Sequence, residues 1–170
     1  MAIIRVASEN DLKVLSRRLL ELVANKDGRA YRENIAKFGI PDEYVRRAFS
    51  EAAFVAASKS GHSTFYLALE NDTIIGFAHM IKQQATIAEL DRLIVLPEHA
   101  RRGIGTQLLR EGVIHQRSEG IRTIVVNAGK QEEQARRFYE KNGFKLTNET
   151  MIDAPWGRKL ALVTYQLNLE

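Results

Sequence analysis

The sequence predicts a mixed α/β (α+β) fold in which one sheet carries helices on both faces. Two observations predict it. Apolar residues recur at helical spacing before Gly61, and short strand-like runs separated by turns follow it. In chain order the pattern is strand, helices, three strands, helix, strand, helix and two strands, which favours a mixed sheet. The 170 residues contain no repeat or linker, so we expect a single domain over residues 1–170.

The N-terminal elements follow from spacing and capping residues. Residues 2–7 read as a strand, and Ser8 is placed to cap a helix that runs to Ala24. Asn25 to Gly28 should end that helix. Two further helices are expected, over residues 29–38 with Gly39 at the end and over residues 41–59 with Pro41 at the start, where proline is tolerated.

The remaining segments predict a meander and then alternating helices and strands. Asn71-Asp72 has the composition of a tight turn between two strands. The expected strands are residues 63–70, 73–83, 86–95, 121–126, one opened by Gly143-Phe144, and 160–169. The expected helices are residues 103–117 and 131–141.

Composition excludes several classes of protein. The absence of cysteine excludes disulfides, cysteine-ligated zinc and a thiol nucleophile, and it fits a reducing cytoplasm. We see no secretory signal, and every apolar run is shorter than a membrane span, so no membrane role is expected. The net charge of +4 comes from scattered basic residues, which argues against nucleic acid as the main ligand. The four histidines lack ligand-like spacing, so no metal is expected.

The most informative segment is a basic, glycine-containing turn between a strand and a helix. It runs LPEHARRGIGTQLL from Leu96, with Arg101 and Arg102 before Gly103 and Gly105. Such a turn directs backbone N–H groups at one point, where the helix N-terminus adds positive potential, so a phosphate or pyrophosphate is the natural ligand. The dinucleotide-binding fingerprint does not match, because Leu108 stands where it requires a third glycine. The P-loop motif does not match either, because no lysine follows Gly105. A glycine turn without a ligand stays open as the alternative.

This segment resembles motif A of the GCN5-related N-acetyltransferases (GNAT superfamily), Gln/Arg-x-x-Gly-x-Gly/Ala after a strand. Gly103 and Gly105 match its glycines, whereas Ala100 replaces the leading Gln/Arg. A second segment, residues 135–144, resembles motif B with its spacing Ala-x-x-x-Tyr-x-x-x-Gly-Phe. Here Glu132 stands where the family often has asparagine. Both motifs occur in the family's order, so the resemblance covers nearly the whole chain.

The resemblance implies an antiparallel N-terminal meander, splayed parallel central strands and acetyl-CoA as cosubstrate. The family holds the cofactor's pantetheine arm between the splayed strands and its pyrophosphate at the glycine turn. The cofactor-binding residues that this implies are Leu93, Val95, Arg101, Arg102, Gly103, Ile104, Gly105, Thr106 and Asn127. Asn127 could instead cap a turn.

The resemblance also implies catalytic roles for two residues. Tyr139 is the expected general acid for the departing CoA thiolate, and a packed aromatic is the alternative. Glu89 is the expected base for the amine; it lies on the same strand face as Asp91, and a solvent-facing or salt-bridged edge is the alternative. Trp156 lies in a predicted loop, where its ring either lines the acceptor pocket or has only a packing role.

The implied activity is transfer of acetyl from acetyl-CoA to a primary amine by direct attack in a ternary complex. A small-molecule or peptide amine is the expected acceptor, and the resemblance allows a homodimer. The rival interpretation is a non-catalytic acyl-CoA-binding regulatory domain on the same fold.

Overall fold

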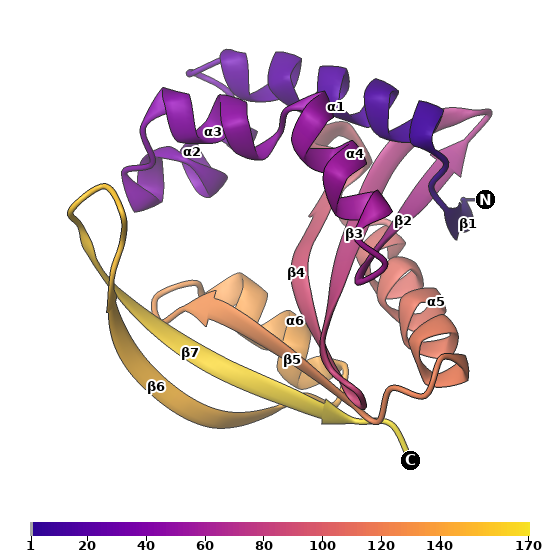
Figure 1. The fold of residues 1–170 in the computed structure, drawn as a ribbon. Coiled ribbons are helices and arrows are strands. Elements are labelled where there is room, and N and C mark those ends of the chain that lie inside the picture. Colours follow the sequence, from indigo (N-terminus) through magenta and orange to yellow (C-terminus); the bar gives the residue numbers. More distant parts are fainter. Residues whose placement is uncertain (1) are drawn as a thin grey trace.

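The computed structural model describes residues 2–170, which form one seven-stranded mixed sheet with helices on both faces (Figure 1). The strand order is β1-β2-β3-β4-β5-β7-β6. The strands are β1 (Ile3–Val6), β2 (Ser63–Glu70), β3 (Thr73–Gln84), β4 (Ile87–Val95), β5 (Thr123–Gly129), β6 (Lys145–Asp153) and β7 (Lys159–Asn168). The helices are α1 (Glu9–Ala24), α2 (Arg29–Asn34), α3 (Asp42–Ala48), α4 (Glu51–Lys59), α5 (Ile104–Ser118) and α6 (Glu133–Lys141), with 3₁₀ turns η1 (Ala36–Phe38) and η2 (Pro97–His99). The predicted fold class is confirmed.

Two cores lie on opposite faces of the sheet. Helices α1 to α4 cover one face, and Leu12, Leu19 and Phe77 are among the residues of this α1–α4 core. Helices α5 and α6 cover the other face, and Leu108 and Val163 belong to this α5–α6 core. Because the sheet is covered on both faces, its central strands carry few exposed side chains.

Two predicted helices are interrupted. The expected helix over residues 29–38 divides at Ile35, where Asn34 Nδ2 donates to the Ala30 carbonyl (2.9 Å) in competition with the helical ladder. The expected helix over residues 41–59 divides at Ser50, whose extended backbone and side chain cap a new helix by accepting from the Ala53 N–H (3.1 Å). Pro41 precedes the first helical residue as the N-cap instead of occupying it.

The N-terminal capping prediction is confirmed, and so is the first hairpin. Ser8 Oγ accepts from the Asp11 N–H while the Asp11 carboxylate accepts from the Ser8 N–H, which is a capping box. Asn71 and Asp72 have φ of 51° and 62°. Both values suit the two-residue turn that matches the twist of antiparallel strands.

The central strands β4 and β5 are parallel but pair over only three residues each. Their register runs from Ile87 opposite Thr123 to Glu89 opposite Val125 and then stops, although β4 continues to Val95 and β5 to Gly129. Beyond this point β5 pairs only with β7, and the ribbons of β4 and β5 diverge in Figure 1. We call the diverging parts the β4–β5 splay.

Candidate functional site

The backbone of β4 presents free polar groups to the β4–β5 splay. Leu96, just past the end of β4, donates its N–H to the carbonyl of Ile75 in β3 (2.9 Å). Since backbone groups alternate in direction along a strand, the N–H and C=O of Val95 and Leu93 point away from β3, toward the side from which β5 has departed. The side chains of both residues pack on the α5–α6 core. These are the backbone groups that the sequence analysis expects to bind pantetheine.

The glycine turn leads from β4 into the N-terminus of α5. Arg101 and Gly103 both have left-handed φ, of 62° and 78°, and Gly103 is the N-cap of α5 without a side-chain hydrogen bond. Glycine adopts this conformation without strain, whereas arginine does so at a cost of about 1 kcal/mol. The N–H groups of Ile104, Gly105 and Thr106 belong to the first turn of the helix, where no carbonyl of the same helix can accept from them. The turn therefore has the backbone geometry of an anion site.

The two arginines of this turn differ in their contacts. Arg102 donates through both terminal nitrogens to Glu70 at the end of β2, and its Nη1 also lies 2.9 Å from His99 Nδ1. Arg101 is exposed, and within residues 2–170 its side chain makes no hydrogen bond or ion pair. Arg102 thus anchors the turn to the sheet, and Arg101 keeps its guanidinium free for a ligand.

The two motifs meet in space at Gly105. A Cβ on this glycine would lie 3.5 Å from Phe138 Cε1 on α6 and 3.8 Å from Val95 Cγ2 on β4. Helix α6 carries Tyr139 beside Phe138, and Tyr139 packs on Phe144 with ring centroids 5.5 Å apart. The turn, the end of β4 and motif B are therefore adjacent on the α5–α6 side of the sheet.

Tyr139 lies half-buried against the α5–α6 core. Burial is the main cause that raises the pKa of its phenol to about 12, and the charge of Glu132 adds to it. Within residues 2–170 the hydroxyl makes no hydrogen bond, so it is free to donate to a ligand. A phenol with this pKa is fully protonated at neutral pH, as a general acid must be.

Glu132, one of the two departures from the family motifs, joins the two halves of the molecule. Its Oε2 lies 2.9 Å from Lys37 Nζ in η1, so it links the start of α6 to the N-terminal helices. A second link comes from the β6–β7 loop, where Trp156 Nε1 donates to the Phe38 carbonyl (3.0 Å) and its ring packs edge-on against Tyr44 (5.6 Å). Trp156 therefore packs between this loop and the helices.

Glu89 and Asn127 face away from the α5–α6 core, at the mouth of the splay. Glu89 accepts from Asn127 Nδ2 (3.3 Å) and from Gln83 Nε2 (3.1 Å), and Asn127 Oδ1 accepts from Thr164 Oγ1 (2.6 Å). Burial raises the pKa of the Glu89 carboxyl above its ordinary value, and the nearby charge of Asp91 raises it further, against these hydrogen bonds. A carboxylate with a raised pKa is a stronger base.

The structure adds residues that the sequence analysis missed. Gln83 is the extra residue of a bulge in β3, because Lys82 pairs with Ala88 and Gln84 with Ile87. Thr164 reaches the site only because β7 inserts beside β5 and places it opposite Asn127. No local pattern marks either residue, since bulges and strand order are set by contacts distant in sequence.

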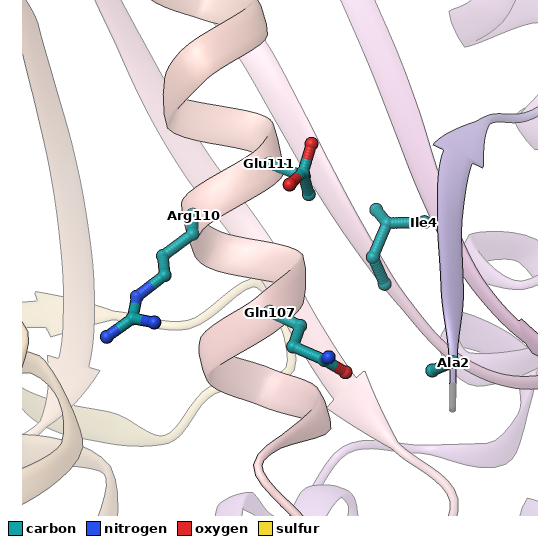
Figure 2. A pocket seen from close by; sticks show the side chains of 5 residues that line it. All are labelled: Ala2, Ile4, Gln107, Arg110 and Glu111. Atoms are coloured by element: carbon teal, nitrogen blue, oxygen red, sulfur yellow. The ribbon is translucent and has the colours of Figure 1, made fainter.

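Two cavities lie away from this region. One of about 420 Å³ lies between β1 and α5, where Gln107 and Glu111 extend toward the strand (Figure 2). The other, of about 510 Å³, lies by Arg122 near the C-terminus. Neither contains a predicted site residue, so the convergence of the motifs identifies the site better than cavity size does. Within residues 2–170, no helix is long and apolar enough to cross a bilayer.

Comparison with known proteins agrees with this geometry. Residues 61–146 match the model of the acetyltransferase (GNAT) domain. The chain belongs to the GNAT acetyltransferase family. It is therefore an N-acetyltransferase, and the expected family and enzyme class are confirmed.

Particular relatives extend the comparison. A spermidine N(1)-acetyltransferase from Thermoplasma acidophilum is 31% identical over 109 residues, which cover 62% of this chain and 67% of the relative. The PaiA N-acetyltransferase of the same organism, solved with coenzyme A, superimposes with a TM-score of 0.70 at 25% identity, over 95% of this chain and 98% of that one. A Salmonella typhimurium acetyltransferase solved with acetyl-CoA has the same fold, with a TM-score of 0.72 at 22% identity over 100% and 95% of the two chains.

Proposed function

We propose that residues 1–170 form one N-acetyltransferase domain that transfers acetyl from acetyl-CoA to the primary amine of a small molecule or peptide. The observation that carries the proposal is the convergence of the splay, the glycine turn and Tyr139 on one side of the sheet. Relatives that bind CoA or acetyl-CoA support the choice of cofactor. The relative named spermidine N(1)-acetyltransferase supports an amine acceptor.

The cofactor would lie along the splay and the turn. The backbone of Leu93 and Val95 pairs with the pantetheine amides as an added strand would. The first N–H groups of α5 and the free guanidinium of Arg101 bind the pyrophosphate. Asn127, which is already bonded to Glu89, stands on the opposite strand and can reach the arm near the thioester.

The reaction is direct attack of the amine on the thioester carbonyl. Glu89 accepts the proton that the ammonium must lose, since an alkylamine is almost fully protonated at neutral pH. An N–H near Leu93 stabilises the oxyanion. The C–S bond then breaks, and Tyr139 gives its proton to the CoA thiolate. The chain contains no cysteine that could carry an acetyl group between two half-reactions.

Calorimetric titration with acetyl-CoA, with CoA and ATP as controls, is the first test. We expect micromolar binding of acetyl-CoA and CoA and none of ATP. Thiol release with a panel of amines that includes spermidine then measures transfer, and intersecting initial-velocity lines identify a ternary complex. Binding without thiol release from any amine contradicts the proposal, and so do parallel lines.

A further inference from the structure

Arg92 on β4 is an enclosed arginine without a hydrogen-bond partner in the part of the chain that the structure describes. Its side chain is 29% exposed, against 37% to 79% for the other five arginines that form ion pairs. Its Nε lies 3.6 Å from Asp91 Oδ2, which is too far for a good hydrogen bond. The guanidinium carbon lies 4.8 Å over the Phe49 ring. The aromatic ring covers one face of the guanidinium, so its edge of N–H donors remains free.

Asp91 neutralises the charge of the Arg92 guanidinium only in part, because the same carboxylate also contacts His79. The same Oδ2 lies 3.3 Å from His79 Nδ1, closer than it lies to Arg92. The histidine is buried, stacks on Phe65 with centroids 4.0 Å apart, and contacts Ser63 Oγ through Nε2 (3.0 Å). Asp91 is therefore held toward His79. A cation that is withdrawn from water without full pairing is unfavourable unless a ligand completes its contacts.

A bulge directs Arg92 to the same face of the sheet as Glu89. His79 pairs with Arg92 and Met80 with Leu90, so Asp91 is the extra residue on β4. The contact with Phe49 places Arg92 on the α1–α4 side. Glu89 points to the same side, because its strand neighbours Ala88 and Leu90 belong to the α5–α6 core. Three strand positions separate the two residues, which amounts to about 10 Å or less of backbone. A proton acceptor and a free cation therefore lie within reach of one small molecule.

We propose that Arg92 binds a carboxylate carried by the amine acceptor, so that the preferred acceptors are amino acids rather than simple amines or polyamines. The inference rests on the proposed function and specifies its acceptor. The planar guanidinium fork matches the two oxygens of a carboxylate. The same charge repels the second ammonium group of a polyamine. Glu89 accepts the proton from the amine of the acceptor, and Arg92 binds the carboxylate at its other end.

The test compares acceptors that differ only in the carboxylate. Thiol release is measured with α-amino acids, with their amides and with their decarboxylated amines, and likewise with ω-amino acids of increasing length and the matching alkylamines. In the wild-type protein we expect kcat/KM to be about tenfold or more higher for the best acid than for its partners, as a charge-assisted hydrogen bond provides. Equal or higher values for the uncharged partners or for spermidine overturn the inference. Thiol release from no amine at all contradicts the proposed function instead, and this inference with it.

Two variants assign the preference to Arg92. Arg92→Met should abolish the preference for the acid while the KM for acetyl-CoA changes less than about twofold. Arg92→Lys keeps a point charge without the fork, so part of the preference should remain, and this variant serves if the methionine variant does not fold. The matched control is Arg137→Met on the exposed face of α6, which should behave as wild type. A preference that survives in Arg92→Met overturns the inference.

Discussion

The side-chain amide of Asn127 donates a hydrogen bond to the carboxylate of Glu89 (3.3 Å), which is the last residue of β4 that pairs with β5. This contact joins the two strands at the point where they diverge. It stabilises the ionised form of Glu89, whereas burial, the larger effect, and the charge of Asp91 favour the protonated form. The result is a carboxylate that is positioned at the mouth of the splay and is more basic than an exposed glutamate.

Glu89→Gln should lower kcat by about 100-fold, the usual contribution of a general base, without changing the affinity for acetyl-CoA. Because the pKa of Glu89 is raised, the wild-type kcat should fall as the pH drops through a value above that of an ordinary glutamate, and this limb should be absent in the variant. Steady-state rates over a range of pH measure both effects. The control is Glu149→Gln. Glu149 lies on the exposed edge strand β6, and its carboxylate pairs with Lys130. Unchanged turnover in Glu89→Gln would remove the residue from the mechanism.

Tyr139→Phe should lower kcat by about 100-fold with little change in the melting temperature, because the hydroxyl that is lost bonds to no protein atom in the described part of the chain. Tyr66→Phe is the matched control, since burial also raises its pKa to about 12. That hydroxyl lies 2.6 Å from His115 Nδ1 and 2.9 Å from Gln116 Nε2, so its removal should destabilise the fold by about 1 kcal/mol and leave kcat unchanged. A Tyr139→Phe variant that is less stable but has an unchanged kcat would show that Tyr139 is a packing residue.

Arg101→Ala should weaken acetyl-CoA binding about tenfold, and the loss should shrink as salt screens the pyrophosphate. Arg102→Ala should instead lower the melting temperature, because it removes the ion pair with Glu70 that holds the turn against the sheet. Calorimetry at two salt concentrations, together with thermal unfolding, separates the two effects. Equal and salt-independent losses of affinity would contradict this division of roles.

Asp11→Asn should destabilise the protein by about 1 kcal/mol at neutral pH, because it removes the ion pair with Arg5 and the charged half of the capping box. Hydrogen bonding to Arg5 is the main cause that lowers the pKa of Asp11 to about 2, and this outweighs its partial burial. A depressed carboxyl pKa contributes stability above its unfolded value and loses it as the pH falls. The difference between wild type and variant should therefore be constant above pH 4, about the ordinary carboxyl pKa, and disappear toward pH 2. Urea unfolding at several pH values measures it, and a difference as large at pH 2 as at neutral pH would contradict the ion pair as its source.

The sequence by itself determined the features that depend on neighbouring residues. The Asn71-Asp72 turn, the Ser8 cap and the helix after Gly103 follow from local backbone preferences, and the structure has all three. The two motifs also lie within short segments, which is why their spacing indicated the family before any fold was known. The roles given to Glu89 and Tyr139 stay predictions.

Tertiary structure alone decided what depends on distant contacts. The bulge that leaves Asp91 unpaired arises from the register against β3, and the placement of Thr164 beside Asn127 arises from the insertion of β7 next to β5. At the break before α4, the local cap by Ser50 is accompanied by a distant contact, in which the Ser16 hydroxyl donates to the Phe49 carbonyl (2.6 Å) across 33 positions of sequence. Propensity and periodicity describe one segment at a time, whereas register, bulges and the enclosure of Arg92 are fixed only when segments pack together.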